Sequence, residues 1–407
     1  MKYSTRWPYI LAAVVTGFFN GTLYTWTYIR DELGYLFPTW SAGDLSFIFS
    51  IHNVAVCATL IGTGILLKRV SSRFMLFISG AAMAVGFGLF PFLPVDRPDV
   101  AYVMVAILFG IIAASSVGMT IIASYALYAK WAPDHTGKLL GAMALAHSIA
   151  PIALSAICSR LIPVVGTLSA VRWVGVGAAA LLYLTLPLAK PPGPDVRLPP
   201  APVRVDNPNQ KEYTPGRMLK IPAFWILFAF NMVMRTSGLI MIDFGGSIAI
   251  YFGLSALLGL LYSPSNGVAN IIGGFLVDRL GTAKVMILCG LALLVGGGMM
   301  LAGNVIGSGP LVISGLLVGG LSYGCCIVQN AASMRYLFGS KNYAQNFGYV
   351  QTSIMVAAFG GYIAGSLLDK QQGSFQGVFI MILCFAIVGI GTGVAMGAFM
   401  KRLRAAE

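Results

Sequence analysis

Long apolar runs alternate with short polar breaks along the whole chain. A helix needs about 20 predominantly apolar residues to cross the hydrocarbon core of a bilayer, and about twelve runs reach that length. Their expected ranges are 8–30, 44–67, 74–93, 101–128, 138–161 and 171–189, then 222–248, 254–277, 285–306, 309–334, 345–367 and 376–399. The pattern predicts an all-α membrane protein with twelve transmembrane helices.

One polar run, residues 190–220, is far longer than the other breaks. It is rich in proline and in charged residues, and Tyr213 is its only aromatic residue, so we expect it neither to continue a helix nor to bury a core. It divides the chain into residues 1–189 and 221–407. We therefore expect two six-helix bundles, the layout of a duplicated membrane protein, joined by an aqueous linker.

Composition supports this class of protein, since 57% of the residues are hydrophobic and only 10% are charged. The formal net charge of +13 would suggest a nucleic-acid partner in a soluble chain. Here most Lys and Arg residues fall on the side that holds both termini and the linker, and the positive-inside rule makes that side the cytoplasm. We expect a monomeric, multi-pass protein of the cytoplasmic (inner) membrane without a nucleic-acid partner.

The sequence shows no pattern typical of catalysis. It has no evident nucleotide-binding loop or nucleophile–base pair, and its six cysteines lie in apolar runs without metal-ligand spacing. We expect the cysteines to be small core residues, and we expect no cofactor, no metal and no enzymatic activity.

A tight turn follows the eighth expected helix, and its residues are ordered as Gly274, Asp278, Arg279 and Gly281. Gly274 permits close helix approach, Asp278 can face the N-terminus of a neighbouring helix, and Gly281 can take a positive φ. We expect these four residues to form a conformational latch between antiparallel helices.

The corresponding turn of the first half holds Gly64, Lys68, Arg69, Ser71 and Arg73. It keeps the spacing but lacks the acid and the second glycine. This pair of turns, one in each half with a central linker between them, resembles the signature of the major facilitator superfamily. The resemblance covers the whole chain and implies two bundles that rock about a central site, exposing it alternately to the two membrane faces.

Four further segments resemble the oxalate/formate antiporter family and the related monocarboxylate porters. They are residues 20–26, with Gly21, Tyr24 and Trp26; residues 130–137, with Trp131, Pro133, Asp134 and Gly137; residues 216–225; and residues 342–348. In family members that handle oxalate or lactate, an arginine occupies the position that corresponds here to Asn270, and the oxalate exchanger adds a lysine at the position that corresponds to Ile354. Since neither charge is present, we do not expect a dicarboxylate held by two cations at those places.

One cation, Arg235, lies near the middle of an expected helix. A charge at that depth costs at least about 2.5–3.5 kcal/mol, so its side chain should face a protein-lined cavity. One interpretation is substrate contact, extended by Asn231 one turn away, and the other is a structural ion pair with Asp243. Those charges are eight residues apart, about 12 Å along a helix. A direct pair would therefore need a kink near Gly238 or Gly245, and we favour substrate contact.

Further candidate residues are polar or aromatic positions inside the expected helices. For substrate binding they are Tyr24 and Tyr28, which share one face of the first helix, Asn266 and Asn270, which share one face of the eighth, and Tyr323, Gln329, Tyr349 and Gln351. For proton coupling they are His147, Asp243 and His52. Each histidine has a second interpretation as an inert, hydrogen-bonded core residue. His147 is the stronger candidate, because the related antiporter family often has a cavity-facing tyrosine at its position.

The favoured function is secondary active transport of a small organic anion, in particular a monocarboxylate, with proton coupling or by exchange. One alternative is a major facilitator exporter of a drug-like or metal-chelate substrate, in which Arg235 is structural. Another is a membrane-embedded sensor or assembly factor. The sequence does not fix the substrate, the direction or the coupling ion.

Overall fold

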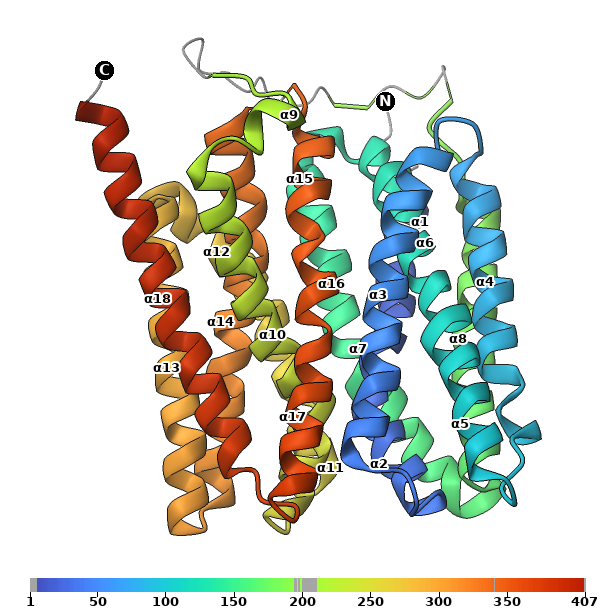
Figure 1. Ribbon diagram of the computed structural model, residues 1–407. Helices are drawn as coiled ribbons and strands as arrows, with labels where there is room; N and C mark the ends of the chain where they lie inside the picture. Colours follow the sequence, from blue (N-terminus) through green and yellow to red (C-terminus); the bar gives the residue numbers. More distant parts are fainter. Residues whose placement is uncertain (1–5, 194–195, 197, 200–210, 340, 406–407) are drawn as a thin grey trace. The chain divides into compact units, whose positions relative to one another are not determined.

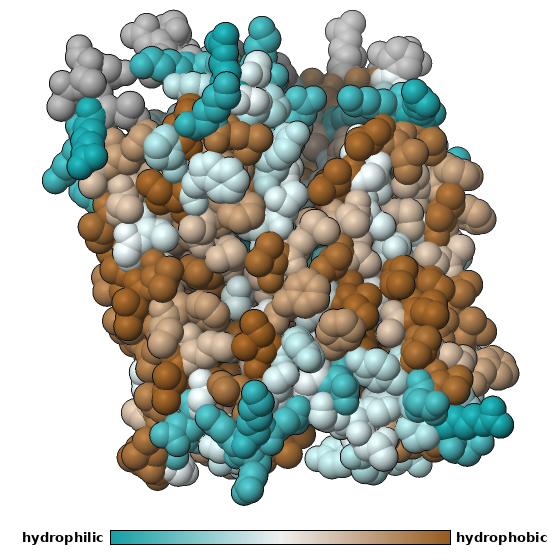
Figure 2. Space-filling view, viewed as in Figure 1, coloured by the Kyte–Doolittle hydropathy of each residue, from teal (hydrophilic) through white to brown (hydrophobic). Residues whose placement is uncertain are grey.

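The computed structural model describes residues 6–193, 196, 198–199, 211–339 and 341–405, and every regular element in those residues is a helix (Figure 1). By their internal contacts, Met1–Trp40 and Ile48–Val205 form a first compact unit, and Ser41–Phe47 with Asp206–Glu407 form a second. On the face drawn in Figure 2, apolar side chains form a wide band, and hydrophilic residues gather toward both ends. This distribution is that of a chain that crosses a membrane many times.

The first unit is built from helices that pack side by side within it. They are α1 (Trp7–Asn20), η2 (Gly21–Thr25), α2 (Trp26–Leu36), α3 (Ala42–Leu66), α4 (Ser72–Gly88), η3 (Phe90–Phe92), α5 (Pro98–Ile107), η4 (Leu108–Ala113), α6 (Ala114–Tyr128), η5 (Ala129–Trp131), η6 (Pro133–His135), α7 (Thr136–Val165), α8 (Thr167–Thr185) and η7 (Leu186–Leu188). The residues of α3 up to Phe47 belong to the second unit by their contacts. The elements η2, η3, η5, η6 and η7 are short 3-10 helices, and η4 is a π-helical segment.

The second unit repeats this kind of packing. Its elements are α9 (Pro215–Met218), α10 (Pro222–Tyr251), α11 (Ala256–Gly259), α12 (Tyr262–Leu280), α13 (Thr282–Ile306), α14 (Gly309–Phe338), α15 (Tyr343–Gln351), α16 (Ser353–Ala357), α17 (Phe359–Lys370) and α18 (Gln376–Ala405). The eleventh expected span therefore contains α15, α16 and α17, which follow one another with single turn residues at Thr352 and Ala358 between them, so that together they form one long apolar segment.

In the described part of the chain, ten helices are long and apolar enough to cross a membrane, and each corresponds to one of the expected spans. The remaining two expected spans are helical but depart from a single long apolar helix. The first is interrupted by the 3-10 segment η2 between α1 and α2. The eighth, expected over 254–277, begins with the short helix α11 and continues as α12, where Ser263, Ser265, Asn266 and Asn270 lower the mean hydropathy.

Glycines set the packing of the first span against α7. A Cβ added at Gly17 would lie 2.4 Å from the carbonyl oxygen of Met143, and one added at Gly21 would lie 2.3 Å from that of His147. Carbon and oxygen atoms do not approach so closely, so only glycine lets the two backbones meet at these points. This contact places η2 directly against His147 of α7.

The beginning of α3 is held within the second unit. The Asp369 carboxylate at the end of α17 accepts hydrogen bonds from the backbone N–H groups of Ala42 and Gly43, each at 2.9 Å. A carboxylate at the N-terminus of a helix satisfies donors that have no partner inside the helix and interacts favourably with the helix dipole. This cap explains why Ser41–Phe47 belongs to the second unit by its contacts.

The end of the linker differs from the expectation of an unstructured aqueous segment. Within residues 211–220 the chain forms the short helix α9, and the Met218 side chain is fully buried. The Tyr213 backbone N–H donates to the Phe338 carbonyl at 3.1 Å, and its own carbonyl accepts from the side-chain amide of Asn346 at 3.0 Å. The expectation was wrong here, because composition does not reveal that α14 and α15 offer partners to this backbone.

Candidate functional site

Arg235 lies in the middle of α10, and its side chain is only 8% exposed. The Arg235 Nε donates to Asn231 Oδ1, and Nη1 donates to the Tyr323 hydroxyl, each at 3.4 Å. The guanidinium carbon also lies 5.5 Å from the centre of the Tyr323 ring, a cation–π distance. Arg235, Asn231 and Tyr323 therefore form one buried cluster, which we call the Arg235 cluster.

Asn231 connects this cluster to the break between α15 and α16. Its side-chain nitrogen donates to the Ser353 hydroxyl at 2.5 Å, and that hydroxyl donates to the Val350 carbonyl at 2.7 Å. Both Asn231 and Ser353 are fully buried. Ser353 was not among the predicted residues. Its polar side chain inside an apolar run was the only signal in the sequence.

Gly238 sets the position of the Tyr323 ring. A Cβ added at Gly238 would lie 2.1 Å from Tyr323 Cδ2, so the ring rests directly on the backbone of α10. This contact directs the tyrosine hydroxyl toward Arg235, which lies three residues earlier on the same helix. The sequence suggested Gly238 only as a possible kink, whereas α10 continues as a helix through it.

Asp243 is fully buried further along α10. A Cβ added at Gly361 of α17 would lie 3.0 Å from Asp243 Oδ2, so this carboxylate packs against the backbone of α17. The helix is not interrupted at Gly238 or at Gly245, and eight residues of regular helix separate two Cα atoms by about 12 Å. α10 therefore continues as one helix between the two charged residues.

The predicted asparagine pair of α12 is formed. The Asn270 side-chain nitrogen donates to Asn266 Oδ1 at 3.4 Å, and Asn266 is buried. Elsewhere in the second unit, Gln351 Oε1 accepts from Asn330 at 3.3 Å. Asn330 is fully buried and was missed in the sequence, because an amide in an apolar run does not reveal which helix it faces.

Two other predicted residues of this unit lie in different surroundings. Gln329 is fully buried and donates to Ser333 at 2.9 Å, and Ser333 donates to Thr282 of α13 at 2.9 Å. This chain joins α14 to α13, so Gln329 holds two helices together. Tyr349 of α15 has an exposed side chain.

In the first unit the structure brings Tyr24 and His147 together. Their rings meet edge to face with centres 5.0 Å apart, and Tyr24 is buried. Tyr24 lies in the 3-10 segment η2, whereas Tyr28 lies in α2. A 3-10 segment has about three residues per turn, so the two tyrosines do not lie on one regular α-helix.

His52 of α3 fits its interpretation as a core residue. It is 1% exposed, its Nδ1 lies 2.9 Å from the Phe109 carbonyl oxygen, and its ring stacks on Phe109 with centres 4.3 Å apart. A carbonyl accepts only, so Nδ1 carries the proton. Phe109 lies in the π-helical segment η4, where the backbone hydrogen-bond register departs from that of an α-helix.

The predicted latch is only partly visible in the described residues. Gly281 has φ +79° and separates α12 from α13, as expected for this glycine. The Arg279 guanidinium carbon lies 4.1 Å from the centre of the Phe275 ring. Gly274 and Asp278 belong to α12, but their side-chain surroundings lie outside the described part.

No group of three or more His, Cys, Asp or Glu side chains that could hold a metal ion occurs among the described residues. Five of the six cysteines are buried, as expected of core residues, and Cys384 of α18 is exposed.

The long apolar helices and the two compact units are typical of a polytopic membrane protein. The buried arginine cluster fits a transporter within that class. The sequence matches the Major Facilitator Superfamily over residues 7–328 and 227–406, and the chain belongs to that family. It is 21% identical over 98% of its length to the oxalate:formate antiporter of Oxalobacter formigenes, 94% of which is covered. It is also 21% identical to the uncharacterized MFS-type transporter YhjX of Escherichia coli (strain K12), over 85% of this chain and 84% of that one.

Solved structures show the same fold. A crystal structure of a D-xylose-proton symporter matches with a TM-score of 0.74 and 14% identity, covering 97% of each chain. The chain is therefore a major facilitator transporter with the all-α membrane fold that the sequence predicted.

Proposed function

We propose that this transporter moves a small organic anion, in particular a monocarboxylate, by alternating access between the bundles 1–189 and 221–407. The observation that carries the proposal is the Arg235 cluster, in which a cation deep in a membrane helix lies beside an amide and a phenol. The relative from Oxalobacter formigenes, named as an oxalate:formate antiporter, supports a carboxylate as the substrate class.

The chemistry of the cluster suits one carboxylate. Guanidinium forms charge-assisted, often bidentate hydrogen bonds with carboxylate oxygens, and these strengthen where water is excluded. The Tyr323 hydroxyl accepts from Arg235 and keeps its own proton for donation to an anion. Asn231 is held by Ser353, so it supports the arginine rather than competing for the ligand.

Arg235 is the one cation of the proposed site, because the two positions at which the antiporter-like family has cations are Asn270 and Ile354 in this chain. With one guanidinium, a monocarboxylate is neutralised, whereas a second carboxylate would remain unpaired and costly to bury. Asn266 and Asn270 add uncharged donors and acceptors on α12. We therefore infer a preference for monocarboxylates over dicarboxylates.

For coupling, we propose that His147 carries a proton during net uptake, with Asp243 as a second acidic group and His52 held in the core. Tyr24 lies against the His147 ring, so a change of charge on the histidine acts on η2, where the first span is already interrupted. The residues Asp278, Arg279, Gly274 and Gly281 act as the latch. The protein is proposed to be a monomer of the cytoplasmic membrane with both termini inside.

The test is counterflow in proteoliposomes loaded with one carboxylate at a time. We expect external labelled monocarboxylate to accumulate against an internal monocarboxylate, and a dicarboxylate of similar size to exchange more slowly. Liposomes loaded with amines or metal chelates serve as the comparison. Exchange of those compounds without any carboxylate exchange would reject the proposal in favour of the exporter, and absence of any flux would favour the sensor.

A further inference from the structure

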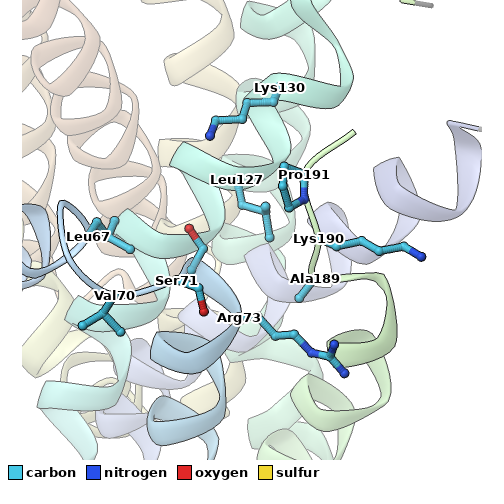
Figure 3. A pocket seen from close by; sticks show the side chains of 10 residues that line it. Leu67, Val70, Ser71, Arg73, Leu127, Lys130, Ala189, Lys190 and Pro191 are labelled. Atoms are coloured by element: carbon cyan, nitrogen blue, oxygen red, sulfur yellow. The ribbon is translucent and has the colours of Figure 1, made fainter. Parts of the chain in front are cut away.

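A pocket of about 370 Å³ lies in the first unit, where α3 meets α4 and where the linker begins (Figure 3). Of the ten residues that line it, three are basic, namely Arg73, Lys130 and Lys190, and none is acidic. All three basic residues are exposed. Within the described residues, no carboxylate lies at ion-pair distance from any of them. The pocket therefore carries positive charge that the described side chains do not neutralise.

Hydrogen bonds hold the backbone on two sides of the pocket, at the start of α4 and at the start of the linker. Ser71 caps α4, because its hydroxyl accepts a hydrogen bond from the Phe74 backbone N–H at 3.2 Å. The N-terminus of a helix adds partial positive charge and N–H groups that favour an anion. On the other side, the buried Trp131 indole donates to the Lys190 carbonyl at 2.8 Å, which holds the start of the linker beside the pocket.

The basic side chains reach different parts of the pocket. Figure 3 shows Arg73 and Lys190 extending to the same side, while Lys130 lies toward the other end. Arginine can bind two oxygens of a phosphate at once, and the lysines act as point charges. This arrangement fits a phosphate group with further anionic or polar substituents better than a single small carboxylate.

The side chains around the pocket favour a phospholipid over a free phosphate ion. On α4, Phe74 is 51% and Phe77 53% exposed, and on α3, Ile65 is 64% exposed. Such apolar side chains beside a basic pocket offer acyl chains a path along the helices. The cytoplasmic leaflet is rich in anionic lipids, and basic pockets between membrane helices on that side bind their headgroups.

We propose that the pocket binds the headgroup phosphate of an anionic phospholipid through Arg73 and Lys190, while Lys130 at the other end adds positive charge for the remaining polar or anionic part of the headgroup. The lipid joins the turn between α3 and α4 to the first residues of the linker. Lipid binding would also explain why the sequence of this turn differs from the superfamily pattern. Where the second half has the positive-φ Gly281, this turn has the capping Ser71, and Lys68 replaces the acid with a further cation.

The test measures lipid binding to the purified full chain in detergent, without any transport substrate. Phosphatidylglycerol is titrated while the apparent melting temperature is recorded, and bound lipid is counted by native mass spectrometry. Phosphatidylcholine and inorganic phosphate are titrated in parallel. The variant Arg73→Gln/Lys190→Gln is compared with Lys220→Gln/Lys401→Gln, which removes the same charge from two exposed positions outside the pocket.

We expect phosphatidylglycerol to raise the melting temperature saturably and phosphatidylcholine to have no effect. A basic residue near an anionic lipid contributes about fivefold in binding, so the pocket variant, which loses two of them, should bind about 25-fold more weakly. The control variant should stay within about twofold of the unmodified protein. Equal losses in both variants would overturn the proposed site. Binding of inorganic phosphate as tight as that of phosphatidylglycerol would overturn the lipid as its occupant.

Discussion

Gly238→Ala tests the packing that places the Tyr323 hydroxyl beside Arg235. The added methyl carbon would lie 2.1, 2.4 and 2.6 Å from three carbons of the tyrosine ring, whereas carbon atoms in contact are about 3.5–4.0 Å apart. The ring must therefore move away from α10 by at least about 1 Å. The hydrogen bond between Tyr323 and Arg235 is already 3.4 Å long, so this movement breaks it.

Two effects follow from that movement. Overpacking of this kind costs about 1–3 kcal/mol of unfolding free energy. Loss of a hydrogen bond to a charged group is worth about 1.5 kcal/mol, so carboxylate affinity should fall about tenfold. The measurements are a denaturant titration and a binding titration on the same purified protein.

A matched control and a double variant isolate the cause. Gly298 of α13 has no atom within 4 Å of an added Cβ, so Gly298→Ala should leave stability and affinity unchanged or improve stability slightly. Replacing the ring as well, in Gly238→Ala/Tyr323→Ala, should cost clearly less than the sum of the two single changes. Purely additive costs, or a Gly238→Ala protein that matches the Gly298→Ala control, would refute the reasoning.

Two further predictions concern coupling and topology. We expect His147→Gln to abolish the pH dependence of net uptake but to spare substrate-for-substrate exchange, because exchange moves no net proton. The control variant His52→Gln should change neither. Wild-type uptake that is flat between about pH 5 and 8 would reject the role of His147. We also expect a reporter fused after Lys401 to be cytoplasmic and one inserted near Pro98 to be external, and the reversed pattern in a reporter assay would contradict the orientation.

The fold was predictable because membrane insertion depends on length and hydropathy, which are local properties of the sequence. Ten helices of the described chain correspond to expected spans for this reason. The 3-10 segment η2 was not predictable in the same way. It lies where Gly21 brings the chain against the backbone of α7, and that contact depends on tertiary packing.

Contacts of the candidate site that lie within one helix were predictable from the sequence. Arg235 with Asn231 and Asn266 with Asn270 follow from spacing along one helix, and both pairs are in contact. Contacts between helices were not predictable, because their register is set by packing across the bundle. Ser353, which holds Asn231, belongs to this second group.

The central claim is that Arg235 binds a carboxylate substrate, and thermal stabilisation by monocarboxylates tests it most directly. A ligand that binds only the folded protein raises its apparent stability, so the shift reports affinity. Lysine keeps the charge of Arg235 without its planar fork, and glutamine keeps neither. The control is Arg217→Gln, which neutralises an exposed arginine in α9.

We predict stabilisation of the unmodified protein and of the Arg217→Gln control, weak stabilisation of Arg235→Lys, and none of Arg235→Gln, with all variants folded. The structural alternative predicts that Arg235→Gln destabilises the protein by leaving the Asp243 charge uncompensated. In that case Arg235→Gln/Asp243→Asn would recover both folding and transport. Carboxylate stabilisation that persists in Arg235→Gln, or transport recovered in the double variant, would contradict the account.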